Sequence, residues 1–430
     1  MKAIFVTLGC KVNQYETQIL QERFAQAGIE PVREGESAQL CVINSCTVTA
    51  SGDKKTRQLL RRLKRQNPDA IMVLTGCYPQ AFPQEAAALE EADIVTGSTN
   101  RGGLLDLVQA YLQSRQRIVQ ILPHQKKEAF EKMSVTRFME RTRAFVKIQD
   151  GCDRYCSYCI IPYARGPLRS KPVEDMTAEL EQLAAHGYQE IVLVGINLLC
   201  YGKDLGIRLI DAVEAACQVE GISRIRLSSL EPELLSLEDL KRLADQPKFC
   251  PQFHLSLQSG CDQTLRAMNR HYDSAEYRRL VEDIRRVFPN PSITTDIMVG
   301  FPGETREDFE ASVCFAQEIG LAKAHVFIYS PRPGTRAANR NDQVPQAEKK
   351  ARSLRMIEAT DQTRRAFLRS QVGREEPVLF ETTQTPYGTE GYTPNYTPVC
   401  VQSEKVLCGQ IRQVRITAAL NDCCLGELIE

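Results

Sequence analysis

Six cysteines fall into two groups whose number and spacing suit iron-sulfur clusters. One group is compact and consists of Cys152, Cys156 and Cys159. The other is spread over the first eighty residues and consists of Cys10, Cys46 and Cys77. A four-iron cluster has four corners, so three thiolates leave one iron open to another ligand, as a catalytic metal site keeps a vacant position. Two such open clusters would indicate chemistry rather than iron storage.

The compact group lies in a loop that follows an apolar, strand-like run at residues 145–151. Its C-x3-C-x2-C spacing lets three thiolates cap three irons of one cluster, and no fourth cysteine follows as in a ferredoxin run. A structural zinc site would require a fourth ligand such as histidine, and the neighbouring residues offer none. This spacing is the strongest chemical signal in the chain.

The dispersed cysteines are related by the elements that precede them. Strand-like runs at 3–9, 39–45, 70–76 and 93–97 alternate with helical patterns at 15–27 and 53–66, which predicts a parallel sheet covered by helices over residues 1–115. Each dispersed cysteine directly follows a strand, and the carboxyl ends of parallel strands share one edge. We therefore expect the three to converge. Two alternatives remain open, namely ordinary core cysteines, as expected for Cys41, and a zinc ion held by three thiolates and water.

Composition limits the class of protein. The chain has 430 residues, of which 43% are apolar, and this predicts two or three globular domains. Its 54 basic and 54 acidic side chains balance, so the protein as a whole has no net charge that would attract nucleic acid. The irregular spacing of 16 cysteines, with no convincing secretory segment, favours the reducing cytoplasm. An alternative is a lipoprotein-type signal ending at Gly9-Cys10, but its apolar run is short. No apolar stretch reaches 18 residues, so we expect no membrane span.

Three further regions follow along the chain. Residues 116–143 lose periodicity and are predicted to be a linker. Six strand-helix repeats over 144–345 predict a partial barrel whose site lies at the carboxyl ends of its strands. A charged helix is expected at 346–370, and short strand-like runs predict a small all-β barrel at 371–430.

Local patches offer candidate contacts to nucleic acid. Residues 53–65 carry seven basic side chains on one predicted helix, from which Arg61 and Lys64 are candidate phosphate contacts. The alternative is a solvated helix face. Tyr387, Tyr392 and Tyr396 interleave with the carboxy-terminal strands, where they either stack on RNA bases or pack the barrel.

The C-x3-C-x2-C loop after a barrel strand resembles the radical S-adenosylmethionine superfamily. The resemblance implies that S-adenosylmethionine binds the open iron and is cleaved to a 5′-deoxyadenosyl radical. It also implies cofactor contacts from the aromatic residue before the third cysteine and from later strand ends, namely Tyr158, Gly195, Asn197, Ser229, Glu231 and Gln258. The Gly-Gly-Glu motif of the superfamily is replaced here by Gly195-Ile196-Asn197, so the residue that contacts the amino group of S-adenosylmethionine is not indicated.

The tail, with GYTPNYTPVCV at 391–401, resembles the TRAM RNA-binding domain, and the whole chain resembles the radical methylthiotransferases. GCKVNQYE at 9–16, the cysteine loop from Cys152 and SSLEP at 228–232 are most similar to the branch that acts on N6-threonylcarbamoyladenosine in tRNA. This resemblance implies two [4Fe-4S] clusters, two molecules of S-adenosylmethionine, and methylthiolation of C2 of that nucleoside, 3′ of the anticodon.

The same resemblance implies partners and leaves alternatives. The partners are the tRNA anticodon loop, with Arg165 as a candidate substrate contact, and a reductant such as flavodoxin or ferredoxin. We expect a monomer, and the sulfur donor is not indicated. The alternatives are isopentenyladenosine in tRNA, an aspartate of a ribosomal protein, or an RNA-binding iron-sulfur protein without catalysis.

Overall fold

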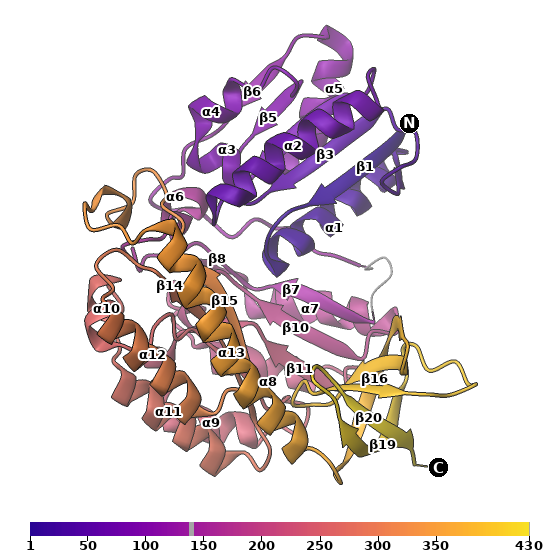
Figure 1. The fold of residues 1–430 in the computed structure, drawn as a ribbon. Coiled ribbons are helices and arrows are strands. Elements are labelled where there is room, and N and C mark those ends of the chain that lie inside the picture. Colours follow the sequence, from indigo (N-terminus) through magenta and orange to yellow (C-terminus); the bar gives the residue numbers. More distant parts are fainter. Residues whose placement is uncertain (137–141, 430) are drawn as a thin grey trace.

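A computed structural model describes residues 1–136 and 142–429. The chain forms an amino-terminal sheet domain, a central partial barrel and a small carboxy-terminal barrel (Figure 1). This mixed α/β architecture confirms the predicted fold class. No helix among the described residues is long and apolar enough to cross a membrane.

The amino-terminal sheet has six parallel strands in the order β2-β1-β3-β4-β5-β6. The strands are β1 Lys2–Thr7, β2 Glu30–Val32, β3 Leu40–Ser45, β4 Ile71–Gly76, β5 Ile94–Thr96 and β6 Ile118–Gln120. The helices are α1 Lys11–Gln26, α2 Ala50–Gln66, α3 Cys77–Ala81, α4 Pro83–Ala87 and α5 Leu104–Ser114, with the 3-10 turn η1 Arg101–Gly103.

Alternate residues of the central strands feed two separate cores, as parallel strands buried on both faces require. Cys41 and Ile43 of β3 pack with Leu60 of α2 on one face. Leu40 and Val42 pack with helices α1 and α5 on the other. Cys41 is fully buried, which confirms the expectation that it is a small apolar core residue.

The predicted linker at 116–143 contains regular structure at both ends. Strand β6 pairs in parallel with β5 as the sixth strand of the sheet, and β7 begins at Arg143. At three residues, β6 is too short to show a periodic pattern in the sequence. Part of the linker, residues 137–141, lies outside the described residues.

The central domain is built from six parallel barrel strands in two sheets, β11-β10-β7 and β12-β13-β14-β15. A bridge between Ile225 and Phe249 joins the sheets. The strands are β7 Arg143–Lys147, β10 Glu190–Val194, β11 Arg224–Leu227 with β12 Ser229–Leu230, β13 Gln252–Leu255, β14 Ser292–Val299 and β15 Lys323–Ile328. A short antiparallel pair, β8 Gln149–Asp150 and β9 Arg169–Ser170, brackets the cysteine loop.

Helices cover the outside of this barrel (Figure 1). They are α7 Val173–Ala185, α8 Leu209–Gln218, α9 Leu237–Ala244, α10 Asp262–Ala267, α11 Ser274–Val287 and α12 Arg306–Ile319. The short helix α6 Ile161–Arg165 instead lies against α3 of the amino-terminal domain. The 3-10 turns are η2 Leu198–Cys200, η3 Pro232–Leu234 and η4 Ala337–Asn339. Helices α9, α11 and α12 begin with capping boxes at Ser236, Asp273 and Thr305, which fix where each helix starts.

Helix α13, Gln346–Ser370, runs from the central barrel to a closed five-stranded barrel (Figure 1). Its strands, in the order β16-β17-β18-β20-β19, are β16 Glu375–Thr385, β17 Gly388–Tyr392, β18 Pro398–Val401, β19 Ile411–Ala419 and β20 Cys424–Leu428. Leu368 of α13 enters the core of this barrel with Val378 and Phe380.

A buried ionic cluster joins the carboxy-terminal barrel to the central one. Glu190 at the start of β10 accepts a hydrogen bond from Arg226 Nε at 2.7 Å, and Arg226 also donates to the Thr393 carbonyl at 2.8 Å. The Tyr392 and Tyr396 rings stack 4.6 Å apart, with Arg143 over both. These two tyrosines therefore pack at the domain junction, where Tyr396 keeps 36% of its surface exposed, and Tyr387 is exposed as well.

Candidate functional site

The three dispersed cysteines follow adjacent strands of the amino-terminal sheet. Cys10, Cys46 and Cys77 come after β1, β3 and β4, which lie side by side. Gly9 has a φ of 109°, and a Cβ at this position would come 2.6 Å from Cys46 Cβ, so only glycine allows the two loops to approach. The structure thus brings together three residues that are remote in sequence.

Asn13 of α1 holds these loops in place. Its side-chain nitrogen donates to the carbonyls of Leu8 at 2.8 Å and Ser45 at 3.0 Å. Its Oδ1 lies 3.8 Å from Cys10 Sγ and 4.0 Å from Cys77 Sγ. A fully buried amide therefore fixes the loops on which the sulfur atoms stand.

Arg165 reaches the same place from the central domain. Its Nε donates to Cys77 Sγ at 3.1 Å, its Nη1 donates to Glu16 Oε1 at 2.6 Å, and its Nη2 donates to Asn13 Oδ1. The side chain is fully buried. In this structure the guanidinium is engaged by protein groups next to the cysteines rather than presented to an open surface.

The surrounding charges form one network across the two domains. Glu16 pairs with Arg101 at 3.2 Å and with Lys147 at 2.9 Å, and Asp150 pairs with Lys147 at 3.2 Å. Burial alone would raise the pKa of Glu16, but Arg101 and Arg165 hold it at about 2. The carboxylate therefore stays charged and binds the domains together electrostatically.

The pKa of the Cys77 thiol is raised to about 12, because burial outweighs the opposing charge of Arg165. A thiol in such surroundings is inert as a free nucleophile. Iron would neutralise the thiolate charge that burial disfavours, since metal ligands bind deprotonated. The donor set of the dispersed group thus fits an iron-sulfur cluster.

The compact group occupies the loop between β8 and α6. Gly151 begins this loop with a φ of 75°, and a Cβ there would collide with the Pro167 carbonyl. Burial raises the pKa of Cys152 to about 11 and that of Cys159 to about 12. As in the dispersed group, these surroundings favour metal-bound sulfur over free thiolate.

Arg270, which follows α10, is a neighbour of this loop that sequence reasoning missed. Its Nη1 donates to Cys156 Sγ at 3.3 Å, its Nη2 donates to Glu231, and its guanidinium lies 5.0 Å from the Tyr272 ring centroid. It stands more than a hundred residues after Cys156 with no spacing signal, so only the fold could reveal it.

The predicted cofactor contacts lie at the carboxyl ends of the barrel strands. Asn197 Nδ2 is 3.9 Å from Cys152 Sγ, and Tyr158 packs edge-on to Phe301 with ring centroids 6.4 Å apart. Gly195 and Ser229 line a cavity between these strand ends and Cys10.

Several buried polar atoms at these strand ends have no hydrogen-bond partner among the residues that the structure describes. They are Asn197 Oδ1, Ser228 Oγ, Glu233 Oε2 and Gln258 Oε1, the last on a residue with a φ of 62°. Unpaired buried polar atoms are costly unless a ligand satisfies them. The strand ends therefore fit a polar cofactor such as S-adenosylmethionine.

The basic helix α2 does not bring its candidate residues to this site. Ala50 at its start contacts Ser330 of the central domain, but Arg61 and Lys64 lie roughly 16–21 Å further along the helix. Arg61 is bonded to Glu91 at 2.8 Å, and Lys64 donates to the Ala70 carbonyl at 3.2 Å. Both residues are engaged at the far end of the amino-terminal domain.

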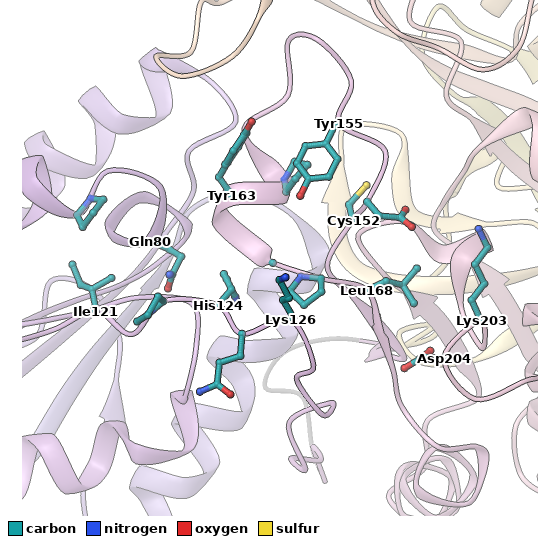
Figure 2. A pocket seen from close by; sticks show the side chains of 17 residues that line it. Gln80, Ile121, His124, Lys126, Cys152, Tyr155, Tyr163, Leu168, Lys203 and Asp204 are labelled. Carbon is teal, nitrogen blue, oxygen red and sulfur yellow. The ribbon is translucent and has the colours of Figure 1, made fainter.

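Two openings adjoin the cysteines. A cavity of about 410 Å³ inside the barrel reaches from Cys10 and Gly195 to Lys323 and Tyr396. An outer groove of about 820 Å³ passes the cysteine loop, and Figure 2 shows Cys152 with Tyr155 and Tyr163 above it. The two tyrosine rings meet edge-on at 6.0 Å and are both exposed. Lys126 and Lys203 also line this groove.

In the part of the chain that the structure describes, no group of three His, Cys, Asp or Glu side chains is gathered so as to hold a metal ion. A four-iron cluster takes one thiolate on each iron rather than three on one ion.

Family models match two parts of the chain. Residues 146–316 match the radical SAM superfamily, and residues 2–97 match the uncharacterized protein family UPF0004.

Curated relatives extend over nearly the whole chain. The threonylcarbamoyladenosine tRNA methylthiotransferase MtaB of Aquifex aeolicus is 40% identical, covering 88% of this chain and 92% of the relative. The Bacillus subtilis protein of that name is 38% identical, covering 96% and 93%. The tRNA-2-methylthio-N(6)-dimethylallyladenosine synthase of Pelotomaculum thermopropionicum is 35% identical, covering 87% and 86%.

Among solved structures, the radical S-adenosylmethionine methyltransferase TsrM from Kitasatospora setae is similar with a TM-score of 0.60. It is 15% identical and covers 78% of this chain and 77% of that chain. At this identity the similarity shows the fold alone.

Proposed function

This chain belongs to the radical S-adenosylmethionine tRNA methylthiotransferases, and from that membership we propose that it adds a methylthio group to C2 of N6-threonylcarbamoyladenosine 3′ of the anticodon. The family implies a [4Fe-4S] cluster, S-adenosylmethionine and a tRNA substrate. We further propose two clusters, one on Cys152, Cys156 and Cys159 and the other on Cys10, Cys46 and Cys77.

One observation carries the two-cluster proposal. The dispersed cysteines converge at the sheet edge that faces the central barrel, and Arg165, six residues after Cys159, donates to Cys77 Sγ at 3.1 Å. A residue that follows the compact group closely in sequence therefore contacts a cysteine of the dispersed group. Such proximity is needed if both groups serve the same substrate atom.

The C2 hydrogen of adenine is not acidic, so a general base cannot remove it and a radical route is required. When bound, the clusters and S-adenosylmethionine would supply that radical and the methylthio group. The chain itself has other tasks. The six cysteines would hold the clusters, Arg270 orients the Cys156 loop, and Asn197, Glu231 and Gln258 would orient the cofactor.

The substrate base would occupy the cavity between Cys10 and Gly195. A base in this place is extruded from its strand, which costs least in a single-stranded loop such as the anticodon loop. The exposed Tyr155 and Tyr163, with Lys126 and Lys203 in the outer groove, offer stacking and phosphate contacts to flanking nucleotides. A flavodoxin or ferredoxin would supply electrons to a cytoplasmic, monomeric enzyme.

Isopentenyladenosine in tRNA is the second candidate substrate, because relatives named for dimethylallyladenosine are 33–35% identical, close to the 33–40% of those named for threonylcarbamoyladenosine. Identity alone therefore separates the two substrates weakly.

Nucleoside mass spectrometry of tRNA from a strain that lacks the gene tests the substrate. We expect loss of the methylthio form of N6-threonylcarbamoyladenosine, with accumulation of its unmethylthiolated precursor. Returning the wild-type gene to this strain should restore the methylthio nucleoside, and returning a gene with Cys156→Ala should not. Loss of the methylthio-isopentenyl nucleoside instead would refute the proposed substrate.

A further inference from the structure

The cavity inside the central barrel carries an unusual polar surface. The inward side chains of three neighbouring strands meet there in register, with His254 of β13 beside Thr294 of β14, and Thr294 beside Lys323 of β15. One step along the strands, Asp296 stands beside His325. Barrel interiors are commonly filled with branched apolar side chains, so this surface indicates a ligand rather than a core.

The polar side chains of β13 and β14 on this surface contact one another. His254 Nδ1 lies 3.0 Å from Thr294 Oγ1, and His254 Nε2 lies 3.4 Å from Asp296 Oδ2. Asp296 is the single carboxylate among the described residues that line the cavity, and His254 already binds it. The His254 and His325 rings lie 6.0 Å apart.

The other side of the cavity carries cations without partners. Lys11, from the amino-terminal domain, and Lys323 both line it. Within residues 1–136 and 142–429, neither ammonium has a hydrogen bond or an ion pair, and Lys11 lies only over the Phe145 ring at 5.9 Å. A third cation, Arg226, is held by Glu190 and by carbonyl groups.

Acidic groups of the carboxy-terminal barrel do not neutralise Lys323. Asp422 is paired with Arg364 at 3.3 Å, and Glu390 accepts a hydrogen bond from Tyr392 at 2.7 Å. The pKa of Lys323 remains lowered, because burial and the charge of Arg364 outweigh the charges of these two carboxylates. Burial likewise lowers the pKa of His325. Apart from Asp296, which His254 binds, no carboxylate among the described residues lines the cavity beside these cations.

We propose that Lys323, assisted by Lys11 and His325, binds the carboxylate on the N6 substituent of the substrate adenosine, so that this end of the cavity selects an amino-acid-bearing base. The inference rests on the proposed function. The threonylcarbamoyl group carries a carboxylate, whereas an isopentenyl group carries none. The cavity runs from Cys10 to Lys323 and Tyr396, so a base placed beside Cys10 directs its substituent toward these cations.

The physical basis of this selection is the cost of unpaired charge. A carboxylate buried without a cation is strongly disfavoured, and a charge-assisted hydrogen bond recovers that cost. An apolar substituent would make no charge-assisted hydrogen bond with the lysines, which remain open to solvent, and sites built for a polar group reject analogues that lack it.

The test uses the full-length protein with both cysteine groups reconstituted and two anticodon stem-loop RNAs. One RNA carries N6-threonylcarbamoyladenosine, and the other carries the same group with its carboxylate converted to a carboxamide. Fluorescence anisotropy gives each Kd, and methylthiolation gives each kcat/KM. We expect the wild-type protein to prefer the carboxylate by about 10- to 100-fold, the value of one charge-assisted hydrogen bond.

Lys323→Met should lose most of this preference while binding the carboxamide RNA as the wild-type protein does. Lys323→Arg, which keeps the cation, should retain the preference. The matched control is Lys241→Met, on the outer helix α9, which should leave both values unchanged. Equal weakening of both RNAs by Lys323→Met, or an unchanged preference, would overturn the inference.

The methionine carboxylate of S-adenosylmethionine is a second carboxylate that Lys323 could bind. An unchanged Kd for S-adenosylmethionine in Lys323→Met supports binding of the substrate carboxylate, and a Kd raised by the same factor as that for RNA overturns the inference.

Failure of the proposed function gives a different result from failure of the carboxylate site. In that case the wild-type protein would methylthiolate a third stem-loop RNA, which carries isopentenyladenosine, but not the threonylcarbamoyl RNA. If it methylthiolates the threonylcarbamoyl RNA and its carboxamide equally, only the carboxylate site fails.

Discussion

Arg165 Nε donates a hydrogen bond to Cys77 Sγ at 3.1 Å, although the two residues belong to different domains. The same guanidinium pairs with Glu16 on the amino-terminal side. One fully buried side chain of the central domain therefore contacts both a cysteine and a carboxylate of the amino-terminal domain. A shift of either domain would have to break this contact.

Replacing Arg165 by methionine should destabilise the protein strongly. Removal of one partner of a buried ion pair costs up to about 3–5 kcal/mol in free energy of unfolding, and here Glu16 would keep only Arg101 and Lys147 as partners. Denaturant unfolding of the wild-type protein and of Arg165→Met under anaerobic conditions measures the difference in free energy of unfolding.

The control for this variant is Arg278→Met, which removes an ion pair with Glu318 at 2.8 Å on the protein surface. Exposed pairs contribute about 0–1 kcal/mol. Equal losses for the two variants would show that the Arg165 network adds nothing beyond a surface pair.

Iron and sulfide analysis after anaerobic reconstitution tests the two-cluster proposal. The wild-type chain should hold about eight irons, four on each cysteine group. Cys10→Ala should reduce this to about four while cleavage of S-adenosylmethionine continues, and Cys156→Ala should abolish cleavage.

Cys314→Ala, at an exposed cysteine of α12, is the matched control and should keep all the iron. A Cys10→Ala protein that retains its full iron content would remove the dispersed group from the proposed ligands.

Arg270→Met should lower the reduction potential of the cluster proposed on Cys156. A cation that donates to a ligating sulfur stabilises the reduced, more negative state, and hydrogen bonds to sulfur are known to set cluster potentials. Loss of a charged hydrogen bond worth about 1.5–3 kcal/mol corresponds to a decrease of about 65–130 mV for one electron. Redox titration followed by electron paramagnetic resonance measures it.

Arg266→Met, on the exposed face of α10, provides a control of equal charge change. A comparable decrease in that variant would assign the effect to net charge rather than to the hydrogen bond.

Acid should remove the contribution of Glu190 to stability. Burial alone would raise its pKa, but Arg226 and Arg143 lower it to about 2, from an ordinary value of about 4.3. Because the folded-state pKa is the lower one, the stabilisation is complete above about pH 5 and is lost as the pH falls toward 2. Glu190→Gln should therefore be less stable than the wild-type protein at pH 7 by about 3 kcal/mol.

The difference between these two proteins should narrow steadily below pH 5, as followed by circular dichroism during denaturant unfolding. Glu375→Gln, which removes a surface partner of Arg415, should show no such narrowing. A constant difference between pH 7 and pH 3 would contradict the buried ionic account.

Much of the fold followed from local patterns. The helix expected at 346–370 matches α13, and the strands expected before Cys10, Cys46 and Cys77 are β1, β3 and β4. These elements are long or strongly apolar, so their periodicity is visible in the sequence. The short strand β6, by contrast, depends on pairing with β5.

The sequence by itself determined the chemistry that lies within one loop and the edge at which strand ends meet. The spacing of Cys152, Cys156 and Cys159 is local, and a parallel sheet aligns its strand ends whatever their distance in sequence. Tertiary structure alone decided the partners that come from elsewhere. It buried Arg165 against Cys77, brought Arg270 to Cys156, and left Lys323 facing an anion-poor cavity. Such contacts arise from packing between distant segments, which no spacing in the chain encodes.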